Sequence, residues 1–207
     1  MKVSRLVSIL LVLTFFGCSD DIQILEERIK TQAELNNTEI SSVEIKKTAL
    51  YLNAWSKKDF YKDAINEFLE EDKLDFPKEI EVLFTGSSSI RFWNSLEEDM
   101  QPLKVLNRGF GGAHISHVNH HFEDVIQRYS PRAIVFFCGT NDLTALKTPE
   151  ETIQDFDILK DKIHQALPGV HLFVIGIKPS PARVYLEKEE IASVSYTHLT
   201  LPTMLMV

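Results

Sequence analysis

The sequence predicts an α/β fold built around a parallel β-sheet. Four short apolar runs have the length and composition of buried strands, and stretches with helical spacing separate them. Strands that alternate with helices of this length form βαβ units, whose strands are parallel. The runs are almost continuously apolar, which is typical of a sheet covered on both faces.

The expected elements follow one another in chain order. Apolar positions from 43 to 69 recur at helical spacing, and Pro77 closes that segment. The four strand candidates are IEVLFTG (80–86), KVLNRGFGG (104–112), AIVFFCGTND (133–142) and HLFVIGIKPSP (171–181). Between them, helices are expected over 90–100, 115–129 and 149–167. In such sheets the chemistry lies at the carboxyl ends of the strands.

Composition and the N-terminus indicate one globular domain with appendages. The chain has 207 residues and a formal charge of −8, so we expect no general nucleic-acid binding. Residues 1–17 combine Lys2 and Arg5 with a short apolar run and end before Cys18. This pattern resembles a bacterial lipoprotein signal, which would make Cys18 the lipidated first residue. An ordinary secretory signal with a chance cysteine is the alternative.

The organisation expected from these features has four parts. After the signal peptide (1–17) come an N-terminal tether and helix (18–55), the main domain (56–192) and a non-native tail (193–207). The acidic SDD after Cys18 resembles an export tag of some Bacteroidetes surface lipoproteins. We therefore expect a lipid anchor in the bacterial cell envelope, with the outer-membrane surface as one location. Cys138 ends an apolar run, which favours a small buried hydrophobe.

Three motifs follow the first three predicted strands. GSSS (86–89) places serines on a strand-to-helix turn, where a hydroxyl can serve as a nucleophile or merely cap a helix. NRGFGG (107–112) lets backbone approach a ligand closely, or is a plain turn. GTND (139–142) offers a side-chain amide to an oxyanion, or forms an Asx turn. Each motif alone is weak evidence for chemistry.

In this order and at these places, the three motifs resemble the blocks of the SGNH (GDSL-type) hydrolase family, in its GSSS-type branch. The resemblance spans about 76–183 and implies a three-layer flavodoxin-like fold with a parallel sheet, incomplete at the C-terminus. It implies that Ser88 is the nucleophile and that the Ser88 N–H, Gly112 and Asn141 form an oxyanion hole. It implies no metal and no organic cofactor.

The family's catalytic base is a histidine with an aspartate three residues before it, after the last strand. No histidine of this sequence fits that place. Asp161 and His164 match the spacing but precede the fourth strand, so we interpret them as a chance match. His171 opens a strand, and His198 lies in the tail.

A histidine cluster at 114, 117, 120 and 121 is a separate candidate. His117 and His121 are spaced to share a helix face that could bind zinc, with Glu123 and Asp124 nearby. Zinc sites need three or four converging ligands, so solvated helix histidines are the favoured interpretation.

The tail VSYTHLTLPT (194–203) interrupts the pattern of alternating strands and helices. It matches one reading frame of a transposon adapter used in short-read sequencing, and the final Val207 fits the adapter's last codon before its stop. We therefore expect the native frame to be cut near Ala192 or Ser193, and exclude the rest from fold reasoning.

The combined expectation is a lipid-anchored serine esterase that acts on acylated carbohydrates or on lipid esters. Because its histidine block is missing, this chain is expected to be inactive. The alternative is a non-catalytic carbohydrate- or ligand-binding lipoprotein on the same fold.

Overall fold

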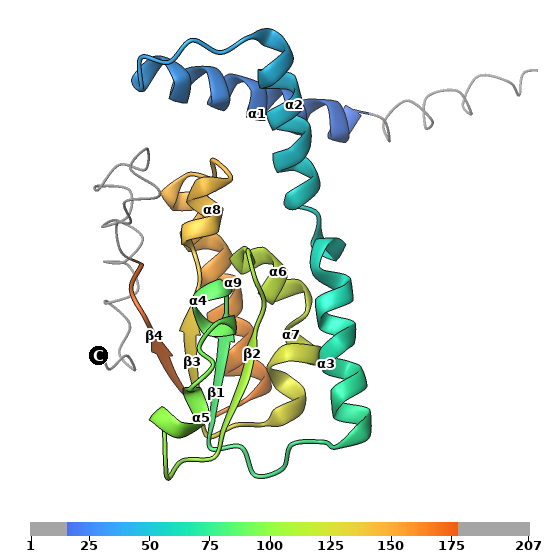
Figure 1. Ribbon diagram of the computed structural model, residues 1–207, viewed down its shortest axis with the longest axis vertical. Helices are drawn as coiled ribbons and strands as arrows, with labels where there is room; N and C mark the ends of the chain where they lie inside the picture. Colours follow the sequence, from blue (N-terminus) through green and yellow to red (C-terminus); the bar gives the residue numbers. More distant parts are fainter. Residues whose placement is uncertain (1–15, 178–207) are drawn as a thin grey trace, which may run out of the picture. The chain divides into compact units, whose positions relative to one another are not determined.

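The computed structural model describes residues 16–177 (Figure 1). The predicted signal peptide up to residue 15, the IKPSPAR segment beyond Ile177 and the predicted tail lie outside the described residues. The chain divides into two compact units, Met1–Ser56 and Lys57–Val207, which are described separately.

The first unit is a pair of helices. α1 covers Phe16–Leu35 and α2 covers Ser42–Trp55, so most of the stretch expected as a polar tether is helical. The N-terminus of α2 is fixed by a capping box, in which Ser41 Oγ accepts from the Glu44 N–H and the Glu44 carboxylate accepts from the Ser41 N–H. Cys18 lies in the first turn of α1.

The second unit contains the remaining helices and all the described strands. Its order is η1 (Lys58–Tyr61), α3 (Lys62–Leu74), β1 (Val82–Gly86), α4 (Ser88–Arg91), α5 (Leu96–Asp99), β2 (Val105–Gly109), α6 (Ile115–His120), α7 (Phe122–Val125), η2 (Gln127–Tyr129), β3 (Ala133–Phe137), α8 (Thr140–Thr144), α9 (Pro149–Ala166) and β4 (His171–Val174). All four predicted strands are present.

The four described strands form one parallel sheet in the order β2-β1-β3-β4. This confirms the predicted α/β fold with a parallel sheet. The chain runs from β1 to β2 on one side and returns to β3 on the other, which is the flavodoxin-like arrangement. Ligands of such sheets bind at the carboxyl ends of the strands where this reversal occurs.

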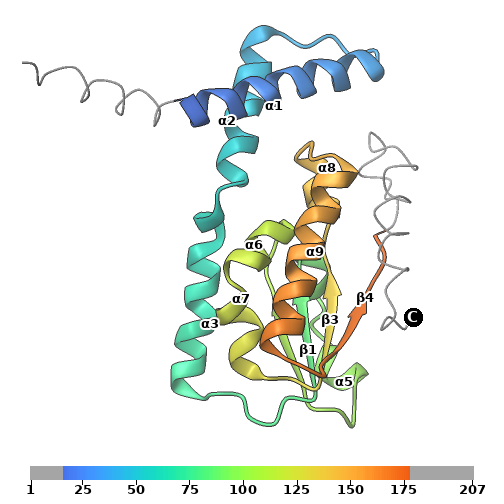
Figure 2. The same cartoon turned by 180° about the vertical axis from the view of Figure 1, so that it is seen from behind.

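Helices lie on both faces of the sheet. Figure 2 shows α6, α7 and α9 over one face, where Phe156, Leu159 and Ile163 pack on Leu83 and Phe136. The opposite face is covered by α4 and α5, whose Ile90 and Leu96 pack on Phe84. Apolar side chains on both sides of β1 explain why its sequence is continuously apolar.

Three predicted helices are interrupted in the structure. The expected helix over 90–100 is two single turns, α4 and α5, because Asp99 accepts hydrogen bonds from the Trp93 Nε1–H and the Ser95 hydroxyl and holds the intervening residues in a turn. The helix expected over 115–129 consists of α6, α7 and η2 and ends at Ser130, whose φ is 44°. The stretch 43–69 is broken after Ser56, the C-cap of α2, whose hydroxyl donates to the Leu52 carbonyl.

Candidate active site

The three predicted motifs lie at one edge of the sheet. Ser88 opens α4 directly after β1, Gly112 follows β2, and Asn141 lies in α8 after β3. These strands are neighbours in the order β2-β1-β3, so their carboxyl ends meet at the top of the sheet in Figure 1. The prediction that these motifs lie at the carboxyl ends of their strands is therefore confirmed.

The turn that presents Ser88 depends on Gly86. Its φ is +123°, and a Cβ there would lie 2.1 Å from the Phe137 carbonyl oxygen. The same oxygen accepts a hydrogen bond from the Ser87 N–H at 2.9 Å. Ser87 is buried, whereas Ser88 is half-buried as the first residue of α4. The strand end thus passes against β3 and turns at once into the helix.

The glycine-rich turn after β2 is bonded to the Ser88 turn. Phe110 N–H donates to the Gly86 carbonyl at 3.0 Å. Asn107 Nδ2 donates to the carbonyl of Ile90 at 2.7 Å, and Asn107 Oδ1 accepts from the Gly109 N–H at 2.9 Å. Sequence reasoning did not single out Asn107, although it is the first letter of the NRGFGG motif.

Gly112 and Asn141 belong to segments that are bonded to each other. Gly112 has a φ of +74°, a left-handed conformation that favours glycine. Asn141 is 4% exposed, and its Nδ2 donates to the carbonyl of Ala113, the residue after Gly112, at 3.0 Å. The Cys138 thiol donates to the same carbonyl at 3.1 Å, and Cys138 is buried, as expected from its place in an apolar run.

A buried charge network supports this edge and was missed from the sequence. Asp142 is fully buried; its carboxylate accepts from the Ile115 N–H at the start of α6 and from Lys147 Nζ at 2.9 Å. Lys147 Nζ also reaches Asp155 at 2.5 Å and donates to Ser116 Oγ at 3.3 Å. Burial raises the pKa of Asp142 to about 6, while the Lys147 ammonium acts in the opposite direction.

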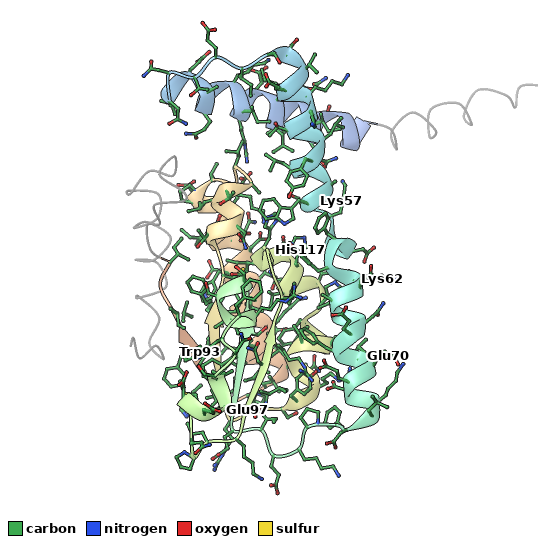
Figure 3. All side chains as sticks on the ribbon, in the orientation of Figure 1. Lys57, Lys62, Glu70, Trp93, Glu97 and His117 are labelled. Atoms are coloured by element: carbon green, nitrogen blue, oxygen red, sulfur yellow. The ribbon has the colours of Figure 1, made fainter. Side chains whose placement is uncertain are left out.

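The histidine cluster holds α6 to its neighbours. His117 Nδ1 accepts from the His114 N–H at 2.9 Å, so its Nε2 carries the proton that faces the Lys57 carbonyl at 3.1 Å (Figure 3). His120 Nε2 lies 3.3 Å from Asp59 Oδ1. His114 is fully buried, and burial lowers its pKa to about 2. His114, His117 and His121 are buried, so the expectation of solvated helix histidines is wrong for those three.

Within residues 16–177, no group of three or more His, Cys, Asp or Glu side chains is arranged to hold a metal ion. The other described histidines lie at the opposite edge of the sheet. Asp161 and His164 are exposed near the end of α9, which leads the chain to the start of β4, where His171 is the first residue. A five-residue strand spans about 16 Å, which separates that edge from Ser88. His198 lies outside the described residues.

Among the helices of the described region, none combines the length and the hydropathy needed to span a bilayer.

Comparison with solved structures gives matches to the fold. A protein from Streptococcus pneumonia named as a platelet activating factor is 17% identical with a TM-score of 0.63, over 78% of this chain and 79% of that one. A GDSL-like lipase from Bacteroides thetaiotaomicron is 16% identical with a TM-score of 0.57, over 69% and 77% of the two chains. AlinE4, an esterase of the SGNH-hydrolase family, is 16% identical with a TM-score of 0.52, over 62% and 76%.

Comparison with curated protein sequences gave no match. The sequence profile of the GDSL-like Lipase/Acylhydrolase family, by contrast, matches residues 84–195, which is more than half of the chain. The matched region begins two residues before the GSSS motif and includes all three strand-end motifs. On this match the chain belongs to the GDSL-like lipase/acylhydrolase family.

Proposed function

We propose that the native protein is a serine esterase in which Ser88 is the nucleophile. Family membership supports hydrolysis of ester bonds in general. The observation that carries the specific proposal is that Ser88, Gly112 and Asn141 follow three adjacent parallel strands within four residues of the strand ends. Hydrogen bonds join their turns directly, from Phe110 to Gly86 and from Asn141 to Ala113.

In the proposed reaction, the Ser88 hydroxyl oxygen attacks the carbonyl carbon of the ester and its proton passes to a base. The carbonyl oxygen then carries negative charge, which the N–H groups of Ser88 and Gly112 and the Asn141 amide would stabilise. An amide nitrogen carries two hydrogens, and one of those on Asn141 Nδ2 is directed to the Ala113 carbonyl. The protonated base gives its proton to the oxygen of the leaving alcohol as the C–O bond breaks, and water, deprotonated by the same base, then attacks the acyl carbon and releases the acid from Ser88.

The base of this reaction is proposed to be a histidine encoded beyond Ala192 in the native gene. Without a base a serine hydroxyl is a poor nucleophile at neutral pH, so this 207-residue chain should have little or no serine-dependent turnover. The burial of His114 and the position of His164 support the view that neither described histidine serves Ser88.

The proposal includes a location and a substrate range. Cys18 would carry the lipid that anchors the protein in the bacterial cell envelope, since the preceding residues have the features of a lipoprotein signal. Acylated carbohydrates and lipid esters are both candidate substrates. A non-catalytic binding protein on the same fold is the second candidate, because the expected histidine is missing from the sequence.

The test is hydrolysis of p-nitrophenyl acetate by the full-length product of the native gene. We expect Ser88→Ala to abolish turnover, whereas Ser89→Ala should leave it within about twofold, because Ser89 is the exposed neighbour in the same motif. Replacing Asn141 by Ala should lower the rate by about 10²- to 10³-fold. Equal rates for the native protein and Ser88→Ala would exclude the nucleophile and favour the binding protein.

A further inference from the structure

A groove of about 490 Å³ is lined in part by Arg91 and Trp93, which follow the proposed nucleophile in the chain, and the proposed reaction assigns it no role. Its floor is the end of β2, from Asn107 to Phe110, and its walls come from α3 on one side and the α4–α5 segment on the other. Figure 1 shows β2 between α3 and the α4–α5 segment. Sites for small molecules commonly enclose about 300–1,000 Å³, so the groove can hold a ligand of that class.

The groove reaches the site through Arg91. Arg91 is three residues after Ser88, one turn along the same helix. A Cβ on Gly111 would lie 3.2 Å from Arg91 Nη1, so the guanidinium lies against the glycine-rich turn, next to Gly112. The Arg91 guanidinium is therefore at the glycine-rich turn, near where the carbonyl of the ester would develop negative charge.

Trp93 is a rigid part of the wall. Its Nε1–H donates to Asp99 at 2.6 Å, and the same carboxylate accepts from the Ser95 hydroxyl at 2.7 Å. Its ring packs edge-on against Phe84, with the centroids 5.6 Å apart and the planes at 80°. Because the ring is held in this way, little conformational entropy would be lost when a ligand packs on it.

The charged side chains of the walls are mainly acidic. Four carboxylates line the groove, Glu67 and Glu71 from α3 and Glu97 and Glu98 from α5. The second guanidinium, Arg108, is directed to the buried Asp72, with Nη2 2.6 Å from the carboxylate. Carboxylates only accept hydrogen bonds and a guanidinium only donates them, so both kinds of polar partner are present.

We propose that this groove holds the alcohol portion of the ester, and that this portion is an uncharged sugar. The inference rests on the proposed esterase function. Sugar hydroxyls donate to carboxylates and accept from a guanidinium, and the apolar face of a sugar ring packs on an indole. A lipid chain would strip water from the four carboxylates without replacing their hydrogen bonds, which is unfavourable. An anionic sugar would meet like charges on both walls.

The test is calorimetric binding to the chain with Ser88→Ala, so that no ester is consumed. The probes are O-acetylated xylotetraose, which is neutral, O-acetylated trigalacturonate, which is anionic, and phosphatidylcholine vesicles. We expect the neutral sugar to bind at least tenfold more tightly than the anionic one. Equal affinity of the two sugars, no binding of the neutral sugar, or tighter binding of the vesicles would overturn the proposal.

Variants in the walls localise the binding. Trp93→Ala should lower the affinity for the neutral sugar at least tenfold. Trp93→Phe, which keeps an aromatic ring, should lower it less. Glu67→Gln should reduce the difference in affinity between the neutral and the anionic sugar, because it removes one negative charge from the wall. Glu70→Gln is the matched control, because Glu70 lies on the same helix in an exposed pair with Lys73 and outside the groove (Figure 3). If Trp93→Ala leaves the affinity for the neutral sugar unchanged and Glu67→Gln leaves the difference between neutral and anionic sugars unchanged, the sugar binds elsewhere and the inference is refuted.

Binding and turnover are separate measurements. If the neutral sugar binds as expected but the native protein does not hydrolyse p-nitrophenyl acetate, the esterase proposal fails and the groove retains its ligand. If Ser88-dependent hydrolysis occurs without binding of the neutral sugar, only the assignment of the groove fails.

Discussion

Replacing Lys147 by Met tests whether the buried charge network stabilises the domain. Lys147 Nζ lies 2.9 Å from Asp142 and 2.5 Å from Asp155. The Asp142 side chain is 0% exposed, whereas that of Asp155 is 22% exposed. Without the ammonium group, Asp155 can still reach water but Asp142 cannot. The variant therefore leaves one buried carboxylate whose remaining described partner is the Ile115 N–H.

The expected loss of unfolding free energy follows from the complete burial of Asp142. Removing one partner of a buried ion pair costs about 3–5 kcal/mol of unfolding free energy. In a domain of this size each kcal/mol shifts the melting temperature by about 2–4 °C, which predicts a fall of about 6–20 °C. Lys73→Met is the matched control: Lys73 and Glu70 are 67% and 68% exposed, and such pairs contribute only about 0.3–0.5 kcal/mol.

The unfolding free energy lost in Lys147→Met should depend on pH in a definite direction. The pKa of Asp142 is raised by burial from 3.8 to about 6, so between these values the folded state binds more protons than the unfolded state. The free energy of unfolding therefore falls as the pH rises through this window. Lys147 lowers the pKa of Asp142, so its removal raises that pKa further and extends the window above pH 6. The loss of unfolding free energy in Lys147→Met should therefore be largest near neutral pH and should become smaller toward pH 5.

The assay is thermal unfolding followed by circular dichroism at pH 5 and pH 7.5. Adding Asp142→Asn to Lys147→Met should recover part of the loss, because the buried charge is then removed as well. A Lys147→Met protein within 1 kcal/mol of the native domain at pH 7.5, or a deficit that grows on acidification, would refute the reasoning.

Three further predictions concern stability, and each is tested by the same thermal unfolding assay. Gly86→Ala should cost about 3 kcal/mol or more, because φ is +123° and the new Cβ would meet a backbone oxygen at 2.1 Å. Gly169→Ala, with φ +86° and nothing within 4 Å of the new Cβ, should cost only about 1 kcal/mol, and equal losses would contradict the steric argument. Arg108→Met should cost about 3–5 kcal/mol by leaving Asp72 buried without its 2.6 Å partner; a neutral result would contradict this. Thr148→Ala should cost about 1 kcal/mol through loss of the α9 capping box, and Thr148→Ser much less.

The strands and the motifs at their carboxyl ends could be predicted because their signals are local. A strand buried on both faces is continuously apolar, and each predicted strand ends in a motif rich in glycine or small polar residues. The helices were predicted less well, because apolar spacing does not register hydrogen bonds that stop a helix. Asp99 is one example: it accepts bonds from Trp93 and Ser95, and the chain turns where the spacing alone favours a helix.

The supporting contacts could not be predicted because they join residues far apart in sequence. Asp142 reaches the Ile115 N–H, and Asp72 reaches Arg108 across 36 positions. Nothing in the local pattern distinguishes Lys147 from an exposed lysine, since its role depends on carboxylates brought together by folding. The motif GTND contained Asp142, but a turn aspartate and a buried network member look the same in one sequence.

The contacts at this edge of the sheet separate the part of the proposed reaction that would hold the ester from the part that would move the proton. The turns that carry Ser88, Gly112 and Asn141 are bonded to one another through residues between 86 and 142. Asn107 adds a bond to the first turn of α4, and Asp142 adds one to the start of α6. None of these bonds uses the predicted histidine base. It follows that the donors of the proposed oxyanion hole can be in place without the proposed base, so ligand binding should persist where serine-dependent turnover is lost.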